Sequence, residues 1–147
     1  MKRSWRILVG VVGLLLVGGC AGRPPAQRTL YDRMGGTPTM RVFVDDLVSR
    51  IGDDTRINRF FKNSEIPLPL VKERLFHQFC EIAGGPCTYL GADMKNAHSG
   101  MGIANTDFDA VMEDIGASLD KAKVPIAERG EFLALLRAMR KDVVEKP

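Results

Sequence analysis

The chain has 147 residues, with 21 lysines and arginines against 18 aspartates and glutamates, for a formal net charge of +3. Three of the basic residues and none of the acidic ones precede Cys20, so the rest of the chain carries 18 of each and is balanced. Basic residues do not cluster with interleaved aromatic residues, which argues against nucleic acid as a partner. The part from Cys20 onward is long enough for one domain with a substantial core.

A positively charged start and a short apolar run open the chain. Lys2, Arg3 and Arg6 precede an apolar stretch over 7–19, which ends at Cys20. This pattern is typical of a secretory signal peptide, and the run is too short to cross a bilayer as a mature helix. We therefore interpret residues 1–19 as a signal peptide that is removed.

The residues around Cys20 predict a lipid anchor. Residues 17–19 (Val-Gly-Gly) resemble a bacterial lipobox, in which the following cysteine is acylated and becomes the first residue of the mature chain. The alternative is an ordinary signal peptide followed by an accidental cysteine. Residues 20–28 contain two prolines and form a spacer. We expect a domain over 29–147, held through Cys20 to membrane lipid in the cell envelope, outside the cytoplasm.

Apolar spacing in the first half of this domain predicts helices. Residues 30–34 form a short helix or turn that the glycine pair at 35–36 ends. A longer helix follows, and after it one further turn over 55–58 would bring Phe60 and Phe61 into the interior. The longer helix carries an apolar stripe at three- and four-residue steps and ends near residue 52; the stripe consists of Met40, Phe43, Val44, Leu47, Val48 and Ile51.

The next helix is predicted to begin in the proline-containing segment 67–69, since Pro69 suits a first helical turn, and to run to about residue 83. At about 100° per residue, His77 points away from its apolar face, and Arg74 and Phe79 flank that face. The residues that share the face are Val71, Leu75, Gln78 and Ile82.

Two more helices complete the pattern. A capping side chain near 106–109 starts the first, and Pro125 begins the second. Alternating apolar strands are not evident, so the sequence predicts an all-α domain. The inward-facing residues are expected to be Phe108, Val111, Met112, Ile115 and Leu119 in the first helix, and Phe132, Leu135, Leu136, Met139 and Val143 in the second.

A short stretch between glycine-rich breaks, residues 89–103, contains His98, one of two histidines in the chain. Such a residue is either a core histidine with its hydrogen bonds satisfied or a ligand to a metal. The chain has no phosphate-binding loop, GxSxG motif, paired-histidine zinc motif or CxxC. Two histidines are too few for a histidine-rich metal site. The remaining possibility is a prosthetic group that supplies four ligands to its metal and needs one more from the protein.

From about Leu30 to the C-terminus, the chain resembles a group 1 truncated haemoglobin. The resemblance implies a two-on-two helical sandwich around one haem b. The matching pieces follow the order of the family: Leu30-Tyr31-Asp32-Arg33-Met34-Gly35-Gly36, Asp53-Asp54 followed by Phe60-Phe61, Gly84-Gly85-Pro86 with Tyr89 and Gly91, and Met94-Lys95-Asn96-Ala97-His98-Ser99-Gly100-Met101-Gly102-Ile103 leading to Phe108.

The resemblance also assigns roles. His98 would be the proximal iron ligand, with its second ring nitrogen donating to a carbonyl group. Met94 would press on the same side of the porphyrin, and Phe61 would pack on the haem while Phe60 lies in the core. Tyr89 would reach a propionate or cap the loop. The remaining residues expected to line the pocket, or to belong to the core, are Phe79, Ile103, Phe108 and Val111.

The distal side departs from the family pattern. Where relatives commonly have a tyrosine and two glutamines, this chain aligns Val48, Val71 and Leu75. A bound O₂ is stabilised by hydrogen-bond donors, so we expect it to be released faster here. Arg74 and Gln78 are the residues that could supply a donor, although Arg74 is expected to pair with a propionate or water. His77 is not expected to be a sixth ligand, because it points outward.

Three functions remain open at this point. The first is reversible binding of O₂, NO or CO. The second is NO dioxygenase or peroxidase chemistry, which would need a separate reductase because the chain has no flavin or nicotinamide motif. The third is a haem-free helical lipoprotein that serves as an interaction module. Cys80 and Cys87 either form a disulfide, which an extracytoplasmic compartment allows, or are free thiols.

Overall fold

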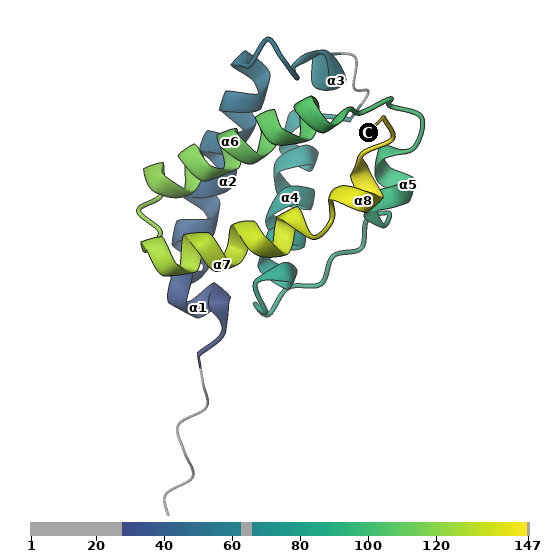
Figure 1. The fold of residues 1–147 in the computed structure, drawn as a ribbon. Helices are drawn as coiled ribbons and strands as arrows, with labels where there is room; N and C mark the ends of the chain where they lie inside the picture. The colour runs from purple at the N-terminus through teal and green to yellow at the C-terminus, as the bar shows by residue number, and fades with distance from the viewer. Residues whose placement is uncertain (1–27, 63–65, 147) are drawn as a thin grey trace, which may run out of the picture.

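The computed structural model describes residues 28–62 and 66–146, which form helices joined by turns and loops (Figure 1). No strand forms within these ranges, which confirms the predicted all-α class, and an isolated bridge joins Ala104 to Lys146. The helices are α1 (Leu30–Met34), α2 (Gly36–Asp53), α3 (Arg59–Lys62), α4 (Leu68–Ile82), α5 (Met94–His98), α6 (Asn105–Lys121), α7 (Ile126–Arg137) and α8 (Arg140–Val143).

The expected signal peptide, Cys20 and all but the last residue of the expected spacer lie outside the described residues. Among the helices that the structure does describe, none combines the length and the apolar character needed to span a membrane.

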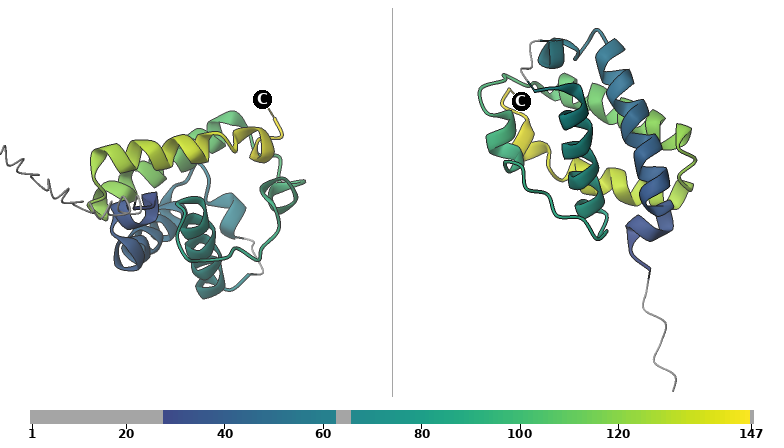
Figure 2. Two further views of the ribbon diagram at one scale, coloured as in Figure 1. Left: turned by 90° about the horizontal axis from the view of Figure 1, so that it is seen from below. Right: turned by 180° about the vertical axis from the view of Figure 1, so that it is seen from behind.

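Four longer helices form two layers. α2 packs against α4 in one layer, α6 packs against α7 in the other, and α6 also packs across α2. Figure 2 shows the two pairs stacked face to face when the molecule is seen from below. The short helices lie at the margins, with α1 against α2 and α7, and α5 against α8. This is the two-on-two helical sandwich that the sequence predicted.

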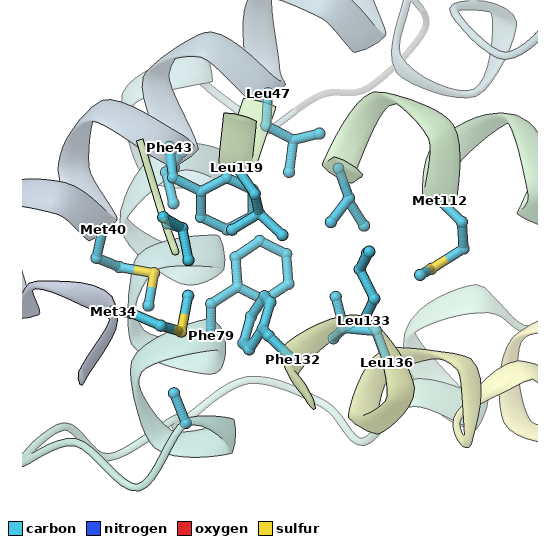
Figure 3. Packing of buried hydrophobic residues seen from close by; sticks show 14 of the residues in the cluster. Met34, Met40, Phe43, Leu47, Phe79, Met112, Leu119, Phe132, Leu133 and Leu136 are labelled. Carbon is cyan, nitrogen blue, oxygen red and sulfur yellow. The ribbon is translucent and has the colours of Figure 1, made fainter. Parts of the chain in front are cut away.

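The core between the layers is built around three phenylalanine rings (Figure 3). Phe43 from α2 has its ring centroid 5.3 Å from that of Phe79 in α4 and 5.9 Å from that of Phe132 in α7. The Phe79 and Phe132 rings meet edge to face at 5.7 Å. Because such pairs stabilise packing beyond the burial of apolar area, these rings fix α2, α4 and α7 relative to one another.

Glycine, proline and aspartate set the helix boundaries as local chemistry predicts. Gly35 adopts a left-handed φ of 108°, which ends α1 and lets α2 begin at once. Pro69 lies in the first turn of α4, where its missing N–H costs no hydrogen bond. α6 begins at Asn105, one residue before the predicted segment, and the Asp107 carboxylate accepts from the backbone N–H of Ala104 at 2.9 Å.

The inward face of α7 differs from the prediction. Leu135 is 40% exposed, whereas Leu133, which was not predicted to face inward, is only 4% exposed. The predicted stripe assumed one continuous helix from Pro125 to Val143, but α7 ends at Arg137 and α8 starts at Arg140. α7 packs against both α1 and α6, and its buried face consists of Phe132, Leu133 and Leu136, while Met139 and Val143 pack against the core from the following segment.

Candidate functional site

A cavity of about 430 Å³ lies between the two layers and reaches α5. Each helix from α2 to α8 contributes to its wall, and most of the lining side chains are apolar. The side chains on the wall that carry polar groups are Arg74, Gln78, Tyr89, His98 and Asp107. A mostly apolar cavity with a few polar groups is suited to bind and orient a large, mainly apolar molecule.

His98 is the last residue of α5 and lies half-buried on the cavity wall. Its Nδ1 atom is 2.7 Å from the carbonyl oxygen of Met94, one turn earlier. A carbonyl oxygen can only accept a hydrogen bond, so Nδ1 carries the proton and Nε2 presents a lone pair. The ring is thus oriented by one nitrogen and can coordinate a metal with the other.

α5 is held at its N-terminal end by Asp93. The Asp93 carboxylate accepts from the backbone N–H of Asn96 at 3.0 Å, and also from the Asn96 side-chain amide at 2.5 Å. The bond from the Asn96 backbone is the main reason why the pKa of Asp93 lies below its ordinary value. A five-residue helix is thereby given a capped start, although so short a helix needs contacts at its other end as well.

α4 forms another part of the cavity wall. Val71, Leu75 and Phe79 present apolar side chains to the cavity. Gln78, on the same helix, donates from Nε2 to the Met94 sulfur at 2.7 Å, which links α4 to the start of α5. The one carboxamide on this wall is therefore engaged with the neighbouring helix.

Arg74 and Tyr89 lie where the large cavity adjoins a second cleft of about 310 Å³, and both residues line both spaces. The Tyr89 ring lies directly against Gly91, where a side chain would collide with it. His77 belongs to the second cleft only, is exposed, and meets the Phe76 ring edge to face at 5.6 Å. The second histidine thus lies outside the large cavity, as its helical position predicted.

Asp107 is a buried acidic residue on the cavity wall. Its carboxylate accepts from the Ala104 N–H and forms an ion pair with Arg59, with 2.6 Å between Nη2 and Oδ1. The bond from Ala104 has the largest effect on the pKa of Asp107, burial opposes it, and Arg59 adds to it, so that the pKa is lowered. The carboxylate is therefore ionised and paired rather than free to bind a cation.

Cys80 and Cys87 form a disulfide, with their Cα atoms 5.8 Å apart. Of the two alternatives left open by the sequence, the structure contains the bridge rather than two free thiols. The bridge ties the last turn of α4 to the loop that leads past Tyr89 to α5. It therefore links two of the elements that carry the cavity wall.

Comparisons with known proteins agree with this geometry. The family model described as bacterial-like globin matches residues 29–145. A group 1 truncated hemoglobin from Tetrahymena pyriformis is 31% identical over 119 residues, which cover 81% of this chain and 97% of that protein. The chain belongs to the group 1 truncated haemoglobin family. Another relative, from Synechocystis, is 33% identical over 101 residues, covering 66% of this chain and 80% of that protein.

Solved structures show the same fold. The truncated hemoglobin of Tetrahymena pyriformis, in its Fe(III) form, superposes with a TM-score of 0.76 at 30% identity, covering 81% of this chain and all of that one. A hemoglobin from Chloroflexus aurantiacus superposes with a TM-score of 0.72 at 26% identity, covering 82% of this chain and all of that one. The helical sandwich and its cavity are thus those of a truncated haemoglobin.

The cofactor of this family is haem, and the cavity of this globin fits one haem b. The donor set agrees, since one neutral imidazole faces a mainly apolar space with an arginine and a tyrosine at its edge. Within residues 28–62 and 66–146, moreover, no group of three or more His, Cys, Asp or Glu side chains could hold a bare metal ion. The geometry therefore favours a prosthetic group that supplies most of its own iron ligands.

With one exception, the residues that the sequence predicted around the haem line this cavity. Val48 is buried in the hydrophobic core instead, and its neighbours Leu47 and Ile51 form that part of the wall. Leu47 and Ile51 are one turn apart on α2 and share a face, whereas Val48 is turned from Leu47 by about 100° around the helix. The predicted residues that do line the cavity are Phe61, Val71, Arg74, Leu75, Phe79, Tyr89, Met94, His98, Ile103, Phe108 and Val111.

Phe61 was expected in the interior, yet it is 40% exposed and lies on the wall at the mouth of the cavity rather than in the core. Phe60 is half-buried and packs against the core, as predicted. Several further wall residues were not predicted at the cavity. Apolar spacing assigned five of them to the core: Met112, Ile115, Leu136, Met139 and Val143. The other three belong to no predicted apolar stripe: Ile57, Ala97 and Met101.

Proposed function

We propose that this truncated haemoglobin binds one haem b through His98 and holds a diatomic gas, O₂, NO or CO, reversibly beside it. The observation that carries the proposal is the hydrogen bond from His98 Nδ1 to the Met94 carbonyl, which leaves Nε2 of the neutral ring with its lone pair at the cavity wall. When bound, haem supplies an iron atom with one further coordination position for a gas molecule.

Other side chains of the cavity have complementary roles in this proposal. Met94 and Phe61 would pack against the bound porphyrin. Arg74 and Tyr89, at the junction of the two clefts, provide a cation and a hydroxyl group for the acidic propionates. The apolar packing surface consists of Phe79, Ile103, Phe108 and Val111.

The distal wall offers few hydrogen-bond donors. Val71 and Leu75 have no polar atoms in their side chains, and the Gln78 amide already donates to the Met94 sulfur. A gas molecule that gains negative charge on binding would therefore find little stabilisation from this wall. We infer that O₂ is bound and released quickly, which suits a sensor, carrier or scavenger better than long-term storage.

The test is a set of absorption spectra of the full chain after haem reconstitution. We expect a haem-bound spectrum that changes on adding CO or O₂ to the reduced protein and returns when the gas is removed. Stopped-flow mixing of the O₂-loaded protein with NO then separates binding from turnover. Rapid nitrate formation sustained by an added reductase would contradict a binding function, and absence of a haem-bound spectrum would leave a haem-free helical module.

We further propose that Cys20 is acylated and holds the domain in the cell envelope, outside the cytoplasm. Support comes from the charged start, the short apolar run and the lipobox-like residues before Cys20. The Cys80–Cys87 disulfide also suits an oxidising compartment. Metabolic labelling with palmitate is expected to mark the chain and to leave Cys20→Ser unlabelled, whereas an unlabelled wild-type chain would contradict the anchor.

A further inference from the structure

α5 does not end in a cap of its own. Ser99, directly after His98, has an extended backbone, and Gly100 and Gly102 adopt left-handed φ angles of 78° and 66°. The glycines allow the chain to turn sharply here, a conformation that side chains with a Cβ disfavour. Because α5 has only five residues, the position of His98 depends on what holds the turn over 99–103.

The carboxylate of Glu145 holds this turn from the C-terminal segment. One of its oxygens accepts from the Gly100 N–H at 2.7 Å, and the other accepts from the Gly102 N–H at 2.5 Å. Backbone N–H groups in such a turn converge to form a concave site for an anion, and here the anion is a side chain of the protein. The two glycines that donate to Glu145 lie two and four positions after His98.

Backbone hydrogen bonds attach the same C-terminal segment to the far side of the turn. The N–H groups of Glu145 and Lys146 both donate to the Ile103 carbonyl, at 2.9 and 3.0 Å, and the Asn105 N–H donates to the Lys146 carbonyl at 3.2 Å. Figure 1 shows α5 beside α8 and the C-terminal end of the chain. The backbone therefore fixes the α6 side of the turn, and the Glu145 side chain fixes the His98 side.

We propose that Glu145 is a positioning residue for His98, which acts by clasping the Gly100–Gly102 turn so that the imidazole keeps its place at the cavity wall. The proposal rests on the proposed function, because it takes His98 as the haem ligand. The bonds from Gly100 and Gly102 also lower the pKa of Glu145, so the carboxylate is charged at neutral pH and these hydrogen bonds are of the stronger, charge-assisted kind.

The experiment compares Glu145→Ala, Glu145→Gln and Asp142→Asn with wild type in the full, haem-loaded chain. Glutamine has nearly the same size as glutamate, but only one of its two terminal atoms is an acceptor oxygen. Asp142→Asn makes the same chemical change three residues earlier, outside the clasp. The measurements are the rate of haem transfer to excess apomyoglobin, the iron–histidine band in the Raman spectrum of the reduced protein, the midpoint of urea unfolding, and hydrogen exchange of the Gly100 and Gly102 amides.

We expect haem loss to be about tenfold faster in Glu145→Ala, or about 1.4 kcal/mol, about threefold faster in Glu145→Gln, and unchanged in Asp142→Asn. The iron–histidine band shifts or broadens, and both glycine amides exchange faster, while the unfolding midpoint falls by no more than the weaker haem binding accounts for. Amide exchange can also be measured without haem, so a variant that loses haem on purification still tests the clasp.

Three results would overturn the proposal. One is haem loss from Glu145→Ala within a factor of two of wild type with an unmoved iron–histidine band. Another is an equal effect of Asp142→Asn, since the change would then reflect the general stability of the segment. The third is an iron–histidine band that persists in His98→Ala, because the ligand itself would be wrong, and the positioning role would fall with it.

Discussion

A single substitution can add a hydrogen-bond donor to the distal wall, which offers few of them. Leu75 lies half-buried on the cavity face of α4, one turn before Gln78, whose amide is engaged with the sulfur of Met94. Leu75→Gln introduces a carboxamide of similar length at this place. One new hydrogen bond to bound O₂ contributes about 1 to 1.5 kcal/mol, so O₂ release should slow by about tenfold.

The assay is stopped-flow displacement of O₂ by excess CO, which reports the O₂ release rate. Leu75→Met is the matched control, because methionine has a similar volume and flexibility but no N–H group. Position 75 is only half-buried, so water can hydrogen-bond the added amide when no gas is bound. If Leu75→Gln releases O₂ as quickly as Leu75→Met, donors on the distal wall do not govern O₂ retention.

Two further predictions concern the stability of the domain. The double substitution Cys80→Ser and Cys87→Ser removes a bridge between residues seven positions apart. It should lower the free energy of unfolding by about 2.5 kcal/mol, because the unfolded chain gains the entropy that the closed loop withheld. Urea melts that match those of the oxidised wild type would contradict this prediction. Since the pKa of Asp107 is lowered by Ala104 and Arg59, its contribution to stability is present above the ordinary aspartate pKa of 3.8 and disappears as pH falls through the lowered value. Urea midpoints between neutral pH and about pH 3 should therefore fall less steeply in Asp107→Asn than in wild type, and equal slopes would refute this.

The helices that could be predicted are those whose apolar spacing is unambiguous. Every residue of the stripe predicted for α2 is buried, because this helix of 18 residues packs its apolar face against both α4 and α6. α7 was harder, since leucines at 133, 135 and 136 surround much of that helix. The packing of α7 against both α1 and α6, which depends on the rest of the fold, buries Leu133 and leaves Leu135 exposed.

The candidate site could be predicted where a residue type is rare and the chemistry demanding. His98 was found because one of only two histidines lies on a short segment between glycine-rich breaks, and the family resemblance then gave it a role. Val48 was predicted both in the apolar stripe of α2 and, from the family resemblance, beside the haem, and helical spacing cannot tell a core residue from a cavity residue on one apolar face. Wall residues such as Met112 and Ile115 were hidden for the same reason.

Contacts between distant parts of the chain could not be read from the sequence. Glu145 is 43 residues from Gly102 and 45 from Gly100, and no local pattern marks a C-terminal glutamate as a partner for a loop that far away. The Cys80–Cys87 bridge is close in sequence, yet whether the two sulfur atoms meet depends on how the chain turns between them. Both features required the folded structure.

The proposed function depends on a bond between His98 and the haem iron, and the absorption spectrum of the reduced, CO-bound protein tests that bond most directly. Wild type and His77→Ala, which changes the exposed histidine outside the cavity, should share a spectrum typical of haem with one histidine ligand. His98→Ala should lose that spectrum and regain it when imidazole is added. An unchanged spectrum in His98→Ala, or its loss in His77→Ala, would contradict the account.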